Sequence, residues 1–283
     1  MAPVATIDFH VTSECSQQCP YCWGPQEIEA VPTDIALRIV SRIAATGARR
    51  IVFTGGDPLQ RDDIAGLIRH ARAEGLEVAV STTGDRLDAE FLAAVAGAVD
   101  LVSLPLDGSC EEVSARTKEP GHFAAVMEAL DLLAAHPRID VKVATPVTRH
   151  NLEDVPAIVA LLDERAAEMP NRLFYNVFQA FPRSMADDVA WDGLVVTAEE
   201  FAALRAAVER RSHAFRINWL DHGTLDRLYV MVFPDGSLTV PSGGRYLDYG
   251  PFLEVEDLEG LLARTDFDAP KHLRHSKGWS RTD

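Results

Sequence analysis

The sequence has few cysteines and lacks a long apolar run. No stretch of about 18 apolar residues occurs, which excludes a membrane-spanning helix. The N-terminus, MAPVATIDFHVT, lacks a basic region followed by an apolar stretch, so we expect no secretory signal and a cytoplasmic, reducing setting. The chain has 4 cysteines, and clustered cysteines in such a setting are more often metal ligands or catalytic groups than disulfides.

Positive charge is also scarce. Lys and Arg number 27 against 43 Asp and Glu, a formal net charge of −16. Binding to nucleic acid depends on neutralising phosphates, and the clusters at Arg49-Arg50 and at 271–277 are short. We therefore expect neither nucleic acid nor a membrane as a partner. The charge weakly favours a small or cationic substrate, although solubility is the simpler explanation.

Short apolar runs alternate with helical patterns along most of the chain. The runs are apolar on both faces, as strands covered by helices on each side must be. About six β-α units in series predict an α/β fold, either an open doubly wound sheet or a barrel. The expected strands cover residues 5–11, 50–54, 76–81, 101–104, 139–144 and 173–180. The expected helices cover 33–46, where Thr33 can cap the first turn, and 62–74, 88–96, 123–135, 152–167 and 198–211.

The pattern changes after about residue 212. Short strands are expected at 215–220, 228–233 and 237–240, with a turn at Pro234-Asp235-Gly236 and a short helix at 255–263. With 47% hydrophobic residues the chain can bury a sizeable core. We therefore expect residues 1–212 to form the core domain and residues 213–283 a small C-terminal α+β extension that covers part of the barrel mouth.

Unusual loops follow the first four expected strands. These are the cysteine loop ECSQQCPYCWG, Gly55-Gly56-Asp57-Pro58, Thr82-Thr83-Gly84 and Leu106-Asp107-Gly108. Because the carboxyl ends of parallel strands share one rim, the four loops should converge there. This convergence predicts an active site.

The cysteine loop spaces Cys15, Cys19 and Cys22 as C-x3-C-x2-C. Three thiolates can hold three irons of a [4Fe–4S] cubane, and the fourth iron then stays open to chelate a small molecule through its amine and carboxylate. A structural zinc ion would want a fourth ligand, for which His10 and Cys110 are the candidates. The spacing favours the cluster, while zinc and incidental thiols remain alternatives.

The same loops resemble the motifs of a known family. Tyr21 stands just before the last cysteine, as in the signature of the radical S-adenosylmethionine (radical SAM) superfamily. Gly55-Gly56-Asp57-Pro58 resembles its Gly-Gly-Glu-Pro motif with Asp for Glu, Ser81-Thr82-Thr83-Gly84 resembles Thr-Thr-Asn-Gly without the Asn, and Leu106-Asp107-Gly108 resembles Ser-x-Asp-Gly with Pro105 in place of a common Ser. The resemblance covers about residues 5–182.

The resemblance implies a partial (β/α)6 barrel with a [4Fe–4S] cluster on Cys15, Cys19 and Cys22 and SAM on the open iron. Such an enzyme cleaves SAM reductively to methionine and a 5′-deoxyadenosyl radical, which takes a hydrogen atom from the substrate. An external one-electron donor of flavodoxin or ferredoxin type is implied. The expected substrate is a small molecule such as a sugar, nucleoside or natural-product intermediate.

Two other functions remain open, a peptide-modifying maturase and a non-catalytic iron–sulfur or zinc protein. No cysteine follows residue 110 that could hold auxiliary clusters, and no N-terminal domain large enough to recognise a leader peptide precedes the first expected strand. Both features weaken the peptide alternative.

The resemblance also implies roles for individual residues. Tyr21 would lie near the adenine, and the backbone of Gly55, Gly56 and Asp57, before Pro58, would accept from the amino group of SAM. Thr82, Thr83 and Asp107 are candidates for the ribose hydroxyls or the amino-acid part, and Arg116 for the carboxylate.

Other residues are candidates on position alone. Cys110, three residues after Asp107, should face the same cavity and could return a hydrogen atom to a substrate radical, although a passive thiol is the simpler interpretation. Further candidates for contact with SAM or substrate are Gln179, Arg183, Ser242, Arg245, Asp248 and Tyr249. We expect the tail residues His272, Arg274 and His275 to form a solvated helix end.

Overall fold

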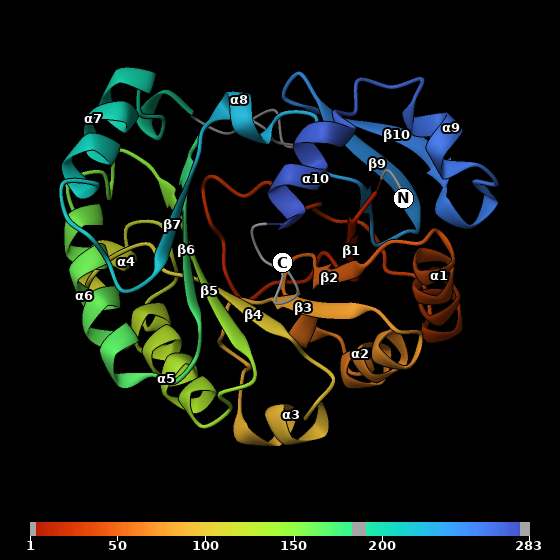
Figure 1. The fold of residues 1–283 in the computed structure, drawn as a ribbon, viewed down its shortest axis with the longest axis horizontal. Coiled ribbons are helices and arrows are strands. Elements are labelled where there is room, and N and C mark those ends of the chain that lie inside the picture. Colours follow the sequence, from red (N-terminus) through yellow and green to blue (C-terminus); the bar gives the residue numbers. More distant parts are fainter. Residues whose placement is uncertain (1–3, 183–190, 278–283) are drawn as a thin grey trace.

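The computed structural model describes residues 4–182 and 191–277. A ten-stranded sheet in the order β10-β9-β8-β1-β2-β3-β4-β5-β6-β7 curves around an open interior, with most helices on its outer face (Figure 1). None of the helices in these two ranges is long and apolar enough to cross a membrane.

The first six strands are parallel, and each pairs with the next along the chain. They are β1 Thr6–His10, β2 Arg50–Thr54, β3 Glu77–Ser81, β4 Leu101–Pro105, β5 Asp140–Val147 and β6 Leu173–Gln179. The helices of this part are α1 Thr33–Ala45, α2 Ile64–Ala73, α3 Ala89–Ala94, α4 Glu111–Ser114, α5 His122–Ala134, α6 Val155–Glu168 and α7 Ala198–Val208. The predicted partial (β/α)6 barrel is confirmed, while the short helix α4 was not predicted.

Helix α1 shows why the periodic segments fold as expected. Its residues Ala36, Ile39, Val40 and Ile43 recur at helical spacing, and all four are fully buried against the sheet. The prediction that Thr33 caps this helix was wrong by one residue, because Pro32 occupies the N-cap position. The Thr33 hydroxyl instead donates to Asp63, the residue just before α2, at 2.6 Å.

The segment after residue 212 adds strands to both edges of the same sheet. Strand β7 (Arg216–Leu220) pairs in parallel with β6, and β8 (Met231–Val232) pairs in parallel with β1. Strands β9 (Ser237–Ser242) and β10 (Arg245–Pro251) continue the sheet as an antiparallel hairpin beyond β8. The short helices of this part are α8 His222–Leu225, α9 Leu258–Leu262 and α10 Ala269–Lys277.

Strand β10 was not predicted, because its sequence RYLDYGP lacks an apolar period and its side chains are mostly exposed. Three-residue 3₁₀ turns complete the description: Pro58–Gln60, Trp191–Gly193 and Phe252–Glu254.

Helix α10 folds back onto the amino end of β1. The Nε2 atom of His272 accepts hydrogen bonds from the backbone N–H groups of Ala5 and Thr6, at 2.9 and 3.2 Å. Its Nδ1 atom bonds to the carbonyl of Leu228 at 2.9 Å. The expectation of a solvated helix end was therefore wrong for His272, which is 4% exposed; Arg274 is exposed, as expected.

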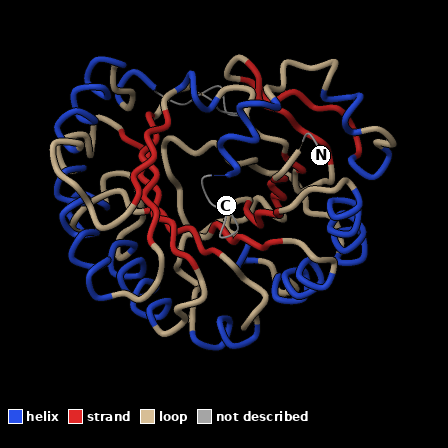
Figure 2. The backbone as a smooth tube through the Cα atoms, in the orientation of Figure 1, coloured by secondary structure: helices blue, strands red, loops and turns tan. Residues whose placement is uncertain are grey.

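The chain between β1 and α1 has no regular secondary structure and carries the cysteine motif. Figure 2 shows this stretch as part of the long loop (tan) on the inner side of the curved sheet.

Candidate functional site

The three motif cysteines line one cavity at the carboxyl end of the strands. Its volume is about 680 Å³, and Cys15, Cys19 and Cys22 contribute to its wall. The loops after β2 and β3 supply the other side, through Gly55, Gly56, Thr82 and Thr83. The predicted convergence of the first three loops is thus what the structure contains.

Each motif sulfur accepts a hydrogen bond from a nearby group. The backbone N–H groups of Gln17 and Gly24 lie 3.4 Å from the Sγ atoms of Cys15 and Cys22, respectively. The Lys118 ammonium lies 3.1 Å from the Cys19 Sγ. Burial raises the pKa of the Cys15 thiol to about 11, so a metal must displace its proton. Three thiols with N–H donors around them fit an iron–sulfur cluster, whose thiolate ligands are stabilised by such bonds.

Neither candidate for a fourth zinc ligand joins the cysteines. Within the ranges 4–182 and 191–277, no three His, Cys, Asp or Glu side chains form a group that could hold a single metal ion. His10 faces a deeper cavity, and Cys110 is exposed. Three separate thiols are what a cubane needs, because each binds a different iron.

The Gly55-Gly56 pair brings the β2 loop directly against the cysteine loop. A Cβ on Gly56 would lie 2.2 Å from the Glu14 carbonyl oxygen, and one on Gly55 would lie 2.2 Å from that of Thr12. The N–H groups of Gly56 and Asp57 donate to Thr12 and Glu14 at 2.8 and 2.7 Å. The glycines therefore position the cysteine loop, and contact of their carbonyls with SAM stays a prediction. Pro58 is buried at the start of a 3₁₀ turn.

Asp57 joins the β2 and β3 loops from below. Its carboxylate is fully buried and accepts from the hydroxyls of Thr82 and Thr83, both at 2.7 Å, and from the N–H of Leu59 at 3.1 Å. Burial raises the pKa of Asp57, and the hydrogen bonds oppose that shift. The two hydroxyl protons predicted to face SAM thus point to Asp57, although both threonines line the cavity.

The prediction that Asp107 contacts SAM is not borne out by its position. Asp107 is fully buried and is not part of either cavity wall. Its Oδ2 atom accepts from the Tyr21 hydroxyl and from the Thr117 hydroxyl, while its Oδ1 atom has no partner. Burial, and then the charge of Asp107, raise the pKa of Tyr21, so the phenol stays protonated and donates. Asp107 therefore anchors Tyr21, which lines both cavities.

Arg116 does not reach the site either. Its guanidinium is exposed and binds the His150 carbonyl oxygen and Glu112, on the outside of the cavity. The cation that does line both cavities is Lys118, which the sequence reasoning missed. Burial alone would lower the pKa of Lys118, but the negative Asp107 and Cys19 together raise it above its usual value.

Cys110 was expected to face the cavity, and this expectation was wrong. The thiol is exposed and does not contribute to the wall of either cavity. The reason is the preceding residue: the N–H and hydroxyl of Ser109 donate to Asp154 at the start of α6, at 2.6 and 2.7 Å. These bonds direct the loop toward the outer helix layer, away from the rim.

The other positional candidates also lie outside the two cavity walls. Gln179 donates to the Val196 carbonyl, and Ser242 donates to Asp266. Arg245 and Asp248 are exposed, and Tyr249 packs against the core. Arg183 falls outside the described residues. The β10 residue that does reach the deeper cavity is Tyr246, whose hydroxyl donates to the Trp23 carbonyl at 2.7 Å.

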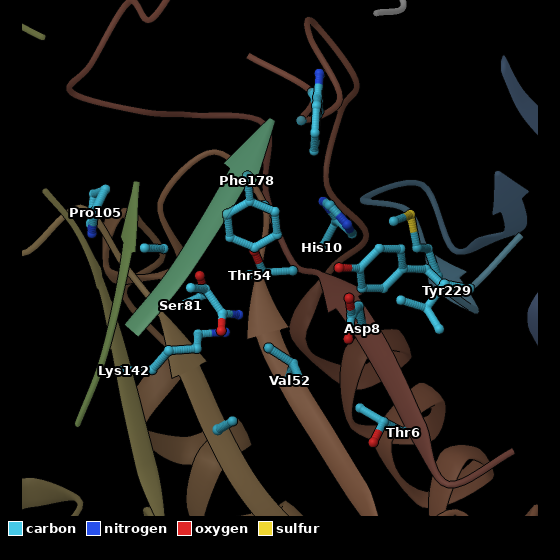
Figure 3. Close-up of a pocket in the computed structure, with 18 of the residues that line it drawn as sticks. Thr6, Asp8, His10, Val52, Thr54, Ser81, Pro105, Lys142, Phe178 and Tyr229 are labelled. Atoms are coloured by element: carbon cyan, nitrogen blue, oxygen red, sulfur yellow. The ribbon is translucent and has the colours of Figure 1, made fainter. Parts of the chain in front are cut away.

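A deeper cavity of about 360 Å³ continues from the cysteine cavity into the barrel. The two share Tyr21, Thr54 and Lys118 among their wall residues. Figure 3 shows Asp8 and His10 on one side of this deeper cavity, with Lys142 extending toward them from the opposite side. These polar residues alternate along β1 and β5, whose inward-facing positions are two residues apart.

The deeper cavity keeps several titratable groups away from bulk water. Burial raises the pKa of Asp8 to about 7, although Lys142 and Arg50 favour its anion. Burial lowers the pKa of Lys142 to about 8, although Asp8 opposes that shift. It also lowers the pKa of His10 to about 4, so this imidazole is neutral, and its Nδ1 atom has no hydrogen-bond partner.

The sequence matches the family model "Radical SAM superfamily" over residues 9–162. The chain belongs to the radical SAM superfamily. The cofactors of this family are a [4Fe–4S] cluster and SAM, and its members related to this chain are enzymes. The match covers the cysteine loop and the three loops after β2, β3 and β4.

The curated relatives come from several branches of the radical SAM superfamily. The GTP 3′,8-cyclase of Chlorobaculum tepidum is 34% identical over 168 residues, which are 56% of this chain and 51% of that protein. The PqqA peptide cyclase of Rhodopseudomonas palustris is 31% identical, over 62% of this chain and 48% of that protein. The chain thus spans about half the length of these two relatives. An S-adenosylmethionine-dependent nucleotide dehydratase of Flammeovirga pacifica is 25% identical, over 89% of this chain and 88% of that protein.

Two solved structures share the fold. Streptococcus suis SuiB bound to its precursor peptide SuiA superposes with a TM-score of 0.73, at 11% identity, over 98% of this chain and 67% of that chain. The structure titled anSMEcpe with bound AdoMet superposes with a TM-score of 0.67, at 13% identity, over 96% of this chain and 82% of that chain. At these identities the likeness concerns the radical SAM fold alone.

Proposed function

We propose that this protein cleaves SAM reductively and abstracts a hydrogen atom from a small molecule bound in the barrel. The observation that carries the proposal is the continuity of two cavities. One is lined by the three motif thiols, and the other is a polar chamber deeper inside the barrel. Cofactor and substrate would therefore meet at the junction near Tyr21 and Thr54, which line both.

In this proposal Cys15, Cys19 and Cys22 hold the [4Fe–4S] cluster, and SAM binds beside it. When bound, the cluster supplies the electron that splits SAM into methionine and a 5′-deoxyadenosyl radical. The Gly55-Gly56 pair holds the cysteine loop in place, and Asp57 holds the β2 and β3 loops together. The wall of the cavity limits access of water to the reactive species.

The substrate is proposed to occupy the deeper cavity. Its volume of about 360 Å³ lies in the range of ligand pockets that enclose small molecules, which supports a sugar, nucleoside or similar metabolite over a long peptide. Asp8, His10 and Lys142 would bind polar groups of this substrate. The similarity along most of the chain to a nucleotide dehydratase agrees with a substrate of this size.

An external one-electron donor completes the proposal. The net charge of −16 is compatible with a transient partner only where local charge permits, and a flavodoxin- or ferredoxin-type protein remains our expectation for the donor.

Anaerobic reconstitution with iron, sulfide and SAM tests the proposal. We expect about four irons per chain and, on reduction with dithionite, formation of 5′-deoxyadenosine. Substitution of Cys15, Cys19 or Cys22 by Ala should abolish both. The matched control is Cys110→Ser, because Cys110 is the remaining cysteine and lies exposed outside both cavity walls.

Two results would contradict the proposal. One is a single bound zinc ion with no cleavage of SAM, which would indicate a non-catalytic metal protein. The other is loss of iron binding in Cys110→Ser, which would place the cluster elsewhere.

A further inference from the structure

We propose that Lys118 sets the reduction potential of the iron–sulfur cluster by holding its ammonium group against the Cys19 sulfur. The inference rests on the proposed function, because it requires a cluster bound by the three motif cysteines. It assigns to Lys118 a positioning role that acts through a ligand of the cluster.

The position of Lys118 is the first argument. Its Nζ atom lies 3.1 Å from the Cys19 Sγ and 5.7 Å from the centre of the Tyr21 ring. The residue is 9% exposed and contributes to the walls of both cavities. A charge in such a place is screened by salt much less than a surface charge is.

The backbone around Lys118 fixes this position. The Lys118 N–H donates to the Ser114 carbonyl at 3.0 Å, at the end of α4. The hydroxyl of the preceding Thr117 donates to Asp107 at 2.7 Å. Asp107 is fully buried and has one carboxylate oxygen without a hydrogen-bond partner, so its charge also favours a cation close by. Lys118 is thus held between the anionic Asp107 and the thiolate of Cys19.

Electrostatics then gives the direction of the effect. Three thiolates give the cluster a negative charge, and reduction adds another electron. A hydrogen-bonding cation beside a ligand sulfur stabilises the reduced form more than the oxidised form, and therefore raises the reduction potential. Removal of the charge should make the cluster harder to reduce.

Arg116 provides a matched comparison. It carries the same charge two residues earlier in the chain, but its guanidinium is exposed and binds the His150 carbonyl oxygen and Glu112. If only net charge mattered, Arg116→Met and Lys118→Met would act alike. The geometry assigns the effect to Lys118 alone.

The test is a redox titration of the reconstituted proteins without SAM, followed by electron paramagnetic resonance of the reduced cluster. At a fixed potential near the midpoint, the ratio of reduced to oxidised cluster should fall about tenfold or more in Lys118→Met, because a unit charge within a few ångströms interacts through several times the thermal energy. Lys118→Arg should restore most of that ratio, and Arg116→Met should match the wild type.

Iron and sulfide content, with circular dichroism as a check of folding, separates the possible failures. A wild-type protein that binds no cluster would overturn the proposed function and this inference with it. A full cluster whose potential is the same in Lys118→Met would overturn the inference alone. Failure of both Lys118→Met and the neutral, hydrogen-bonding Lys118→Gln to take up iron would place Lys118 in cluster assembly, and would overturn it too.

Discussion

Asp57 illustrates, at the scale of single residues, how a motif position can serve the scaffold. Its carboxylate gathers three donors from two loops, and no part of it is exposed. The shorter side chain, compared with the Glu of the family motif, allows the bond to Leu59 two residues later, in the manner of an Asx turn. The loops that present Gly55 and Thr82 to the cavity are thereby fixed to each other.

Replacing Asp57 by Ala should therefore destabilise the fold. Three donors would lose their acceptor, two of them on buried threonines, and we expect a loss on the order of 3 kcal/mol in the free energy of unfolding. Thr82→Val and Thr83→Val each remove one donor and should cost about 1 kcal/mol. Urea denaturation of the apoproteins measures all three. Equal losses in the three variants would contradict the central role of the carboxylate.

The sequence could predict the cysteines and glycines of the site because their motifs are local. It could not choose between Arg116 and Lys118, two cations in the same segment. Which of them faces inward depends on α4, a helix of four residues that is too short to have a recognisable period, and on the bond from Lys118 to Ser114 at its end. The position of Cys110 depends on the same turn and on Asp154, which lies in a distant segment.

At the scale of elements, the contact between the β1 and β2 loops decides the shape of the cysteine loop. Two N–H groups of the β2 loop donate to Thr12 and Glu14, so the thiol-bearing chain is held to the neighbouring strand before any metal binds. This approach requires a residue without a side chain at position 56, because the atoms that a Cβ would meet belong to backbone and cannot rotate away.

Gly56→Ala should consequently reduce the capacity of the protein to bind iron. The added methyl group would lie 2.2 Å from the Glu14 carbonyl and must displace the cysteine loop. The control is Gly66→Ala, in the middle of α2, where a Cβ meets nothing within 4 Å and should stabilise the helix by up to about 1 kcal/mol. Iron and labile sulfide per chain after reconstitution provide the measurement. A full complement of iron in Gly56→Ala would refute the clash.

Strands β1 to β6 could be predicted because strands buried on both faces are apolar throughout. Strand β10 could not, since it is exposed at the edge of the sheet, and its sequence has the Gly and polar residues of a loop. The turn before it uses Gly243 and Gly244 at φ of 58° and 76°, a conformation that favours glycine.

At the scale of the whole molecule, His272 joins three distant parts of the chain. It receives N–H groups from Ala5 and Thr6 and bonds to the carbonyl of Leu228, and the first of these contacts spans 267 residues. No local pattern could reveal such a contact, which is why the sequence suggested a solvated helix end. Burial lowers the pKa of His272, because only the neutral ring can accept from two N–H groups and remain away from water.

The contribution of His272 should therefore depend on pH. Since its folded pKa lies below the ordinary value of 6.5, its stabilising effect is full above that pH and is lost as the pH falls toward the folded value. His272→Ala should lower the free energy of unfolding by about 2 kcal/mol at pH 7.5, and by clearly less at pH 5. Chemical denaturation at the two pH values measures the difference from the wild type.

Arg274→Ala is the control on the same helix, because Arg274 is exposed, and its effect should be small at both pH values. A destabilisation by His272→Ala that is the same at pH 5 and pH 7.5 would show that the ring acts by packing alone.

The order of the strands has a consequence for biosynthesis. Strand β1, which leads into the thiol-bearing loop, lies between β2 and β8, so its second neighbour is translated more than two hundred residues after it. On the ribosome, the nascent chain therefore keeps one edge of this strand unpaired until the final fifth of the polypeptide has emerged. Metal insertion machinery would meet an accessible ligand loop during that interval, and a prematurely terminated chain would expose an adhesive strand edge to other molecules.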